Sequence, residues 1–161
     1  MKKFLLVALF FLLSGCGNNT GETKLTTDDV IKAFQKAGLP IGRIEVYSEE
    51  TDPEHLLGRP GHYIGKCAWE DTRYRAKTPE EQAIQDVFFK SQGANGLTGG
   101  FIEAFESQDE LQSREKLLRT AYENNPLVFQ YIFVHKNIIL RIDQEITPQQ
   151  AEEYKSVLNN I

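Results

Sequence analysis

The sequence predicts an α+β fold, with a sheet of about five mainly antiparallel strands and helices packed on one face. Helical and strand-like periods follow one another in the order α, β, β, α, β, α, β, β, α. The last two strands are separated by too few residues for anything except a hairpin, so they must pair antiparallel. Residues 100–106 are apolar on both sides of the alternation, which is typical of a central strand. A helical crossover after that strand would instead give a mixed sheet, which is the alternative.

The first fifteen residues have the pattern of an export signal. Lys2 and Lys3 precede an apolar run over residues 4–13, which is about half the length that a membrane-spanning helix needs. The run ends in Leu-Ser-Gly-Cys, which resembles the lipobox of bacterial lipoproteins. That resemblance implies removal of residues 1–15 and lipid attachment to the sulfur of Cys16. An ordinary signal peptide that happens to end in cysteine is the less favoured interpretation. We therefore expect a lipid-anchored protein on the extracytoplasmic face of the cell membrane.

The mature chain divides into a short tether and one domain. Residues 16–24 are polar and glycine-containing and predict a flexible tether, and residues 25–161 predict a single α+β domain. The full chain has a formal net charge of −5, and loss of the two leader lysines makes it −7. An acidic surface disfavours nucleic acid, which needs Lys or Arg at each phosphate contact. We expect no nucleic-acid partner. The same acidic surface disfavours anionic lipid headgroups, so the lipid, and not charge, must hold the protein at the membrane.

The elements of the first half have clear start and stop signals. Thr26 or Thr27 caps a helix that ends at Gly38, and an alternating strand follows over residues 41–47. A second strand is expected over residues 63–74, with Lys66, Glu70 and Thr72 on its polar face and the following residues on its core face: Tyr63, Cys67 and Trp69. Cys67 has no base at a fixed spacing, so buried packing is favoured over a reactive thiol.

The second half contains three capping boxes. They begin at Thr78, Ser107 and Thr147 and predict three helices. The helix after Ser107 has a charged face that we expect to be solvated: Arg114, Glu115, Lys116 and Arg119. The glycine-rich loop at 91–100 is a weak phosphate-binding signal, because it leads into a strand and not into a helix. Residues 127–135 and 137–143 predict the terminal hairpin.

The most unusual segment lies between the first two strands, at residues 51–63. Asp52 before proline predicts an N-cap, Gly58 predicts a left-handed residue, and Arg59-Pro60-Gly61 predicts a tight turn. Its polar residues form the candidate binding loop: Asp52, Glu54, His55, Arg59, His62 and Tyr63. Histidines and carboxylates at short spacing can bind a divalent metal, but this spacing matches no known metal motif. The interpretation that these residues only shape the loop is favoured, and we expect no metal and no cofactor.

Five motifs together resemble a group of small bacterial secreted proteins and lipoproteins. Besides the lipobox and the Gly-Leu-Pro at 38–40, these are D-P-x-H-L-L-G-R-P-G at 52–61, G-G-x-I-E-x-F at 99–105 and T-P-x-Q-A-x-x-Y at 147–154. The resemblance covers most of the mature chain except residues 78–97, and it implies an insertion there. It implies a single extracytoplasmic domain with the 52–63 loop as its hallmark, and it brings no catalytic residue.

Two classes of function fit these observations. The first is a tethered, non-enzymatic binding module that meets an envelope protein or surface ligand through the 52–63 loop. The absence of a nucleophile elbow, a zinc-protease helix and a phosphate loop favours it. The second is a small envelope hydrolase or metal-dependent enzyme that uses His55 and His62 with Asp52 or Glu54. Convergence of the two imidazoles with a carboxylate would distinguish the two classes.

Overall fold

One antiparallel sheet organises the chain. The computed structural model describes residues 23–90, 97–125 and 129–161. The strands are β1 (Ile41–Val46), β2 (Gly65–Asp71), β3 (Gly99–Ala104), β4 (Gln130–His135) and β5 (Ile138–Asp143). They lie in the order β1-β2-β3-β5-β4, and every neighbouring pair is antiparallel. The predicted α+β class, the five strands and the central position of β3 are confirmed, and the described sheet is not mixed.

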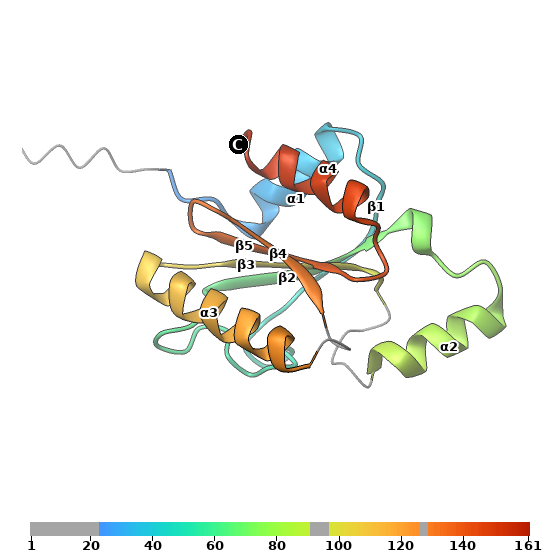
Figure 1. Cartoon of the computed structure of the whole chain (residues 1–161), viewed down its shortest axis with the longest axis horizontal. Coiled ribbons are helices and arrows are strands. Elements are labelled where there is room, and N and C mark those ends of the chain that lie inside the picture. The colour runs from blue at the N-terminus through green and yellow to red at the C-terminus, as the bar shows by residue number, and fades with distance from the viewer. Residues whose placement is uncertain (1–22, 91–96, 126–128) are drawn as a thin grey trace, which may run out of the picture.

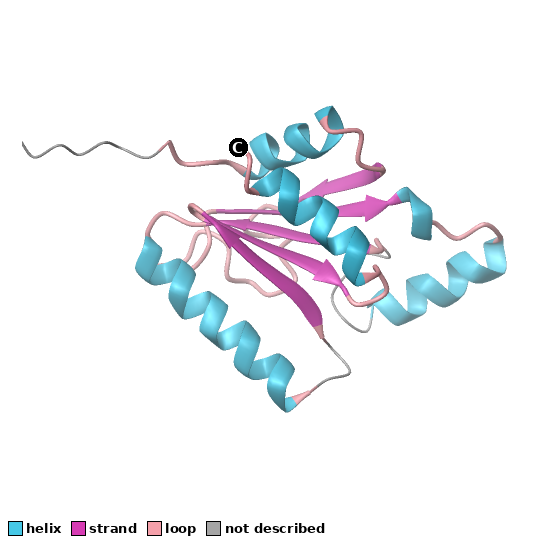
Figure 2. Ribbon diagram, turned by 45° about the horizontal axis from the view of Figure 1, so that its top comes forward, coloured by secondary structure: helices cyan, strands magenta, loops and turns pink. Residues whose placement is uncertain are grey.

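The helices lie on both faces of the sheet, which corrects the prediction of one covered face. Figure 1 shows α1 (Thr27–Lys36) and α4 (Pro148–Leu158) on one side and α3 (Gln108–Asn124) on the other. Figure 2 shows the same arrangement from a second direction. The core is accordingly split, with Phe34, Trp69 and Tyr154 in the layer under α1 and α4. Leu111 and Leu118 of α3 pack in the opposite layer with Phe101. Both faces of β3 are thereby buried, as its sequence requires.

Local sequence signals explain where three of the helices begin. Thr26, Ser107 and Thr147 each accept a hydrogen bond from the backbone N–H three residues later, and the side chain at that position bonds back to the cap. These reciprocal bonds satisfy backbone donors that a helix start leaves unpaired. The capping boxes at Ser107 and Thr147 are confirmed, and α1 begins at the predicted place.

The second strand is shorter than predicted, and its faces differ from the expectation. It ends at Asp71, where a 3-10 turn, η1 (Thr72–Tyr74), begins. Cys67 and Trp69 pack under α1 and α4, but Tyr63 lies before the strand and packs on the α3 side. Lys66 was predicted on the polar face of the strand, but its side chain is buried. The polar face of β2 is therefore covered, which the sequence alternation alone could not reveal.

The helix α2 (Pro79–Lys90) does not cover the sheet. It stands to one side of the sheet in Figure 1, and its apolar side chains Ile84 and Val87 are exposed. Thr78 accepts a hydrogen bond from the N–H of Glu81, as its predicted capping role requires. In the described part of the chain, no helix is long and apolar enough to cross a bilayer. The predicted signal peptide, Cys16 and most of the predicted tether lie outside the described residues.

Candidate binding loop

The segment between β1 and β2 forms part of the cover on the α3 face. Leu57 and Tyr63 are buried in that core layer together with Phe105, whose ring meets Tyr63 edge to face. Gly58 has a φ of 74° and the N–H of His62 donates to the carbonyl of Arg59. The predicted left-handed glycine and tight turn are therefore confirmed. The loop is packed onto the sheet and does not stand off into solvent.

Asp52 is the centre of the loop. Its carboxylate is buried and accepts hydrogen bonds from the backbone N–H groups of Leu56 (2.8 Å) and Leu57 (3.0 Å). The same carboxylate accepts the hydroxyl of Tyr63 at 2.7 Å. The predicted capping role of Asp52 is therefore seen, although the residues after it form turns and not a helix. Through these bonds, one side chain fixes both ends of the loop.

Lys66 joins the loop to the sheet. Its ammonium group lies 2.8 Å from Asp52 Oδ1 and 3.0 Å from Glu54 Oε2, and it also bonds to the Tyr63 hydroxyl at 3.2 Å. It lies over the rings of Tyr47 and Tyr63 at about 5 Å, close enough for cation–π attraction. A buried ammonium needs such partners, because loss of water from a charge is costly.

A second set of ion pairs continues the network below α3. Arg114 makes two hydrogen bonds to the buried carboxylate of Glu103, at 2.9 and 2.8 Å, and a third to Glu54 at 2.6 Å. Arg141 reaches Glu103 at 2.7 Å. The network therefore runs without a break from Asp52 in the loop to β5. It contains three cations and three carboxylates: Lys66, Arg114, Arg141, Asp52, Glu54 and Glu103.

The cations keep these carboxylates ionised. Burial alone would raise the pKa of Glu54, but the charges of Arg141, Lys66 and Arg114 outweigh it and lower that pKa to about 2. Burial opposes ionisation of Glu103 in the same way, and Arg141 and Arg114 hold its pKa below the usual value. The pKa of Asp52 is lowered against burial by Lys66 and Tyr63. The cluster therefore behaves as a charged, internally neutralised unit, with no carboxylic acid poised to exchange protons near neutral pH.

Four members of this network were not among the sequence candidates: Lys66, Glu103, Arg114 and Arg141. Arg114 was assigned to a solvated face, but it is buried. Glu103 offered the one usable signal, because a carboxylate inside an otherwise apolar central strand must have a buried cationic partner. Its partners come from α3 and β5, and sequence spacing does not reveal such distant pairings.

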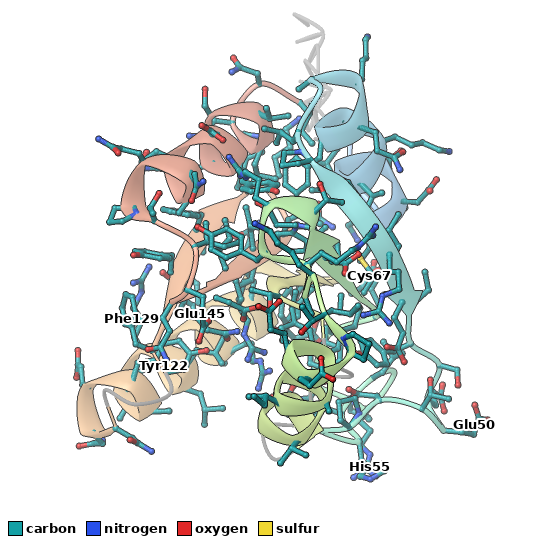
Figure 3. The ribbon with its side chains drawn as sticks, turned by 90° about the vertical axis from the view of Figure 1, so that its right-hand side faces the viewer. Glu50, His55, Cys67, Tyr122, Phe129 and Glu145 are labelled. Carbon is teal, nitrogen blue, oxygen red and sulfur yellow. The ribbon has the colours of Figure 1, made fainter. Side chains whose placement is uncertain are left out.

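The remaining loop candidates are not members of the charge network. His55 and Arg59 are exposed and His62 is half-buried, and Figure 3 shows His55 at the outer surface of the molecule. Asp52 and Glu54 are engaged with Lys66 and Tyr63. Among residues 23–90, 97–125 and 129–161, no three His, Cys, Asp or Glu side chains could together hold a metal ion. The geometry thus gives the metal-dependent alternative no support.

Cys67 lies on the opposite side of the sheet from the loop. It packs in the core layer with Trp69 and Ile102. Burial raises the pKa of its thiol to about 12, so the reactive thiolate form does not accumulate near neutral pH. Its position agrees with the predicted packing role.

Comparison of the chain with protein-family models, curated proteins and solved structures finds no match. The resemblance suggested by the five motifs therefore stays a prediction.

The charge network predicts the direction of the pH dependence of stability. Asp52, Glu54 and Glu103 have folded-state pKa values below their ordinary values of 3.8, 4.5 and 4.5. Groups of this kind stabilise the fold above their unfolded pKa, and that contribution is lost as the pH falls through the folded pKa. We expect the free energy of unfolding to change little from pH 7 to 5 and to fall steeply toward pH 2. Urea titrations across this range measure it, and a flat profile down to pH 2 would contradict the assignment.

Proposed function

We propose that this chain is a lipid-anchored, extracytoplasmic lipoprotein domain that acts as a non-enzymatic binding module in the bacterial cell envelope. Cys16 at the end of a short apolar leader supports the anchor. The 52–63 loop is the proposed contact surface, and its partner is an envelope protein or a surface ligand.

The proposal rests on one observation: some side chains of the loop are buried and held in place, and others are exposed to solvent. Asp52 and Tyr63 point inward and are fixed by the buried network, whereas His55 and Arg59 face solvent. A recognition loop held in one conformation loses little entropy on binding. The backbone of His55 is in the left-handed region, at φ 54°, which costs energy for a non-glycine residue. The surrounding hydrogen bonds, including one from the His55 N–H to the carbonyl of Asp52, maintain that conformation.

The test is crosslinking on intact cells followed by mass spectrometry. The doubly substituted protein Arg59→Ala/His62→Ala is expected to lose partners that the wild type captures, because both side chains lie on the proposed contact surface. Lys36→Ala is the matched control, since Lys36 is exposed on α1, on the other side of the sheet. Cys16→Ser is expected to lose fatty-acid label and membrane attachment. Identical partners in the wild type and the loop variant would remove the loop from the proposal.

A further inference from the structure

The two edges of the sheet are built differently. The outer strand β1 contains Gly42, Arg43 and Glu45, and its pairing with β2 is irregular between Ile41 and Ile44. Charges and irregular pairing are common ways to prevent another strand from adding to an edge. The other outer strand, β4, has the sequence Gln-Tyr-Ile-Phe-Val-His and pairs with β5 in regular register along its whole length. It has neither a proline nor a formally charged residue, and among the described residues no other strand pairs with its outer side, so this edge is open to strand addition.

The hairpin geometry indicates which backbone groups of β4 face outward. His135 and Ile138 face each other across the two-residue turn Lys136-Asn137, where Lys136 has a φ of 50°. The pair that flanks such a turn exchanges hydrogen bonds, and antiparallel pairing uses every second residue. Ile132 and Val134 therefore direct their N–H and C=O groups to the free edge. Val134 is itself 36 % exposed.

A groove of about 440 Å³ lies along this edge, between β4 and the C-terminal half of α3. Tyr122 of α3 and the consecutive residues 129–133 line it. Phe129 is 40 % exposed and stacks edge to face on Tyr122 and Tyr131, at centroid distances of 6.3 and 5.1 Å. The volume is within the range of about 300–1,000 Å³ of known ligand sites. The groove therefore has room for a large apolar side chain next to the open edge.

The charges beside the groove favour a basic partner over a second copy of the chain. Arg119 lines the groove but is already paired with Glu115, at 2.7 Å. Glu123 lines it as well, and no ion pair of Glu123 is found among the described residues. Burial raises the pKa of Asp143, and the nearby charge of Glu145 raises it further. Asp143 accepts a hydrogen bond from Gln130, which lines the groove, so the negative charge of Glu145 is close to the groove as well. Two copies with a net charge of −5 each would also repel one another.

We propose that β4 and this groove bind an extended segment of another protein, which adds to the sheet as a sixth strand. The segment has aromatic or large aliphatic side chains at alternate positions and Lys or Arg at its ends. Main-chain hydrogen bonds to Ile132 and Val134 supply affinity, and the groove beside Phe129 selects the side chain. This surface is separate from the 52–63 loop, because Figure 3 shows Phe129, Tyr122 and Glu145 well apart from His55. The inference stands whether or not the loop binds a partner.

The experiment uses the processed protein isolated from its host cells and the synthetic peptide Lys-Thr-Phe-Thr-Phe-Thr-Lys. We expect saturable binding by fluorescence anisotropy and slower amide exchange in residues 129–135 when the peptide is present. A peptide with proline in place of the central threonine lacks the backbone N–H at that position, so it cannot donate a main-chain hydrogen bond to the strand edge from there. A peptide with glutamate ends would be repelled. Each is expected to bind at least about tenfold more weakly.

Two edge variants form a matched pair. Val134→Lys places a charge on the open edge and is expected to weaken binding by about tenfold or more. Val46→Lys makes the same change on β1, where Val46 is 71 % exposed, and is expected to leave binding unchanged. Phe129→Ala provides a second loss of binding if Val134→Lys fails to fold by circular dichroism. Amide exchange on the wild type needs no variant at all.

Three results would overturn the proposal. The first is absence of saturable binding by any of the peptides. The second is binding that leaves amide exchange in residues 129–135 unchanged, which would place the peptide elsewhere. The third is a concentration-dependent dimer that Val134→Lys abolishes, because the edge would then belong to a second copy of this chain.

Discussion

Glu103→Ala is expected to lower the free energy of unfolding by about 3–5 kcal/mol, because it removes one member of a buried ion-pair network. Glu103 is fully buried and receives two bonds from Arg114 and one from Arg141. Without it, two guanidinium groups under α3 retain Glu54 as their remaining carboxylate in the network. The cost arises mainly from cations left in a poorly solvated place, and less from the lost attraction itself. Urea denaturation at pH 7 measures it.

The matched control is Glu115→Ala on the same helix as Arg114. Glu115 pairs with Arg119 at the surface, four residues apart, and Arg119 is 52 % exposed. Solvent screening makes such a pair worth only about 0.3–0.5 kcal/mol. A double-mutant cycle of Glu103→Ala with Arg114→Ala adds a second criterion, since the two losses should be far from additive. A loss for Glu103→Ala as small as that for Glu115→Ala would show that the network contributes little to stability.

The sequence predicted the elements well because their signals are local. Each confirmed helix start depends on a cap and a residue three positions away, and the terminal hairpin depends on a two-residue turn. The sequence did not predict which face α3 covers. That choice depends on α3 packing over Phe101 and Ile139, and these contacts join residues that are far apart in the chain.

The candidate site was predicted in part for the same reason. The loop sequence indicated Asp52 as a cap and Gly58 as left-handed, and both are found. It did not indicate that Asp52 and Glu54 would be neutralised by Lys66 from β2 and by the arginines beneath α3. The loop motif and the G-G-x-I-E-x-F motif are therefore joined by the same charge network. Glu103 of the second motif belongs to the network that holds the loop in place. The buried residues of the loop motif are thus explained by their part in folding. Its exposed residues, such as His55 and Arg59, are the ones available for binding.

Gly100→Ala is expected to destabilise the protein by about 3 kcal/mol or more, since the added methyl has no room. Gly100 lies in the central strand β3, opposite Trp69 on one neighbour and Ile142 on the other. A Cβ there would overlap the carbonyl oxygen of Arg141 and lie 2.7 Å from the Trp69 ring. The first contact is with backbone, so β3 and β5 would have to separate. Because Arg141 also holds Glu103, the shift would disturb the charge network as well.

Gly65→Ala is the matched control in the neighbouring strand. A Cβ at Gly65 would lie 3.6 Å from Ala104 and Thr27, an ordinary packing distance. It is expected to change stability by less than about 1 kcal/mol, because the added methyl meets its neighbours without displacing them. Urea denaturation of both variants gives the comparison, and amide exchange in β3 and β5 should quicken only in Gly100→Ala. Equal stability of the two variants would mean that the two strands can separate at little cost, and the close approach at Gly100 would then not explain the glycine.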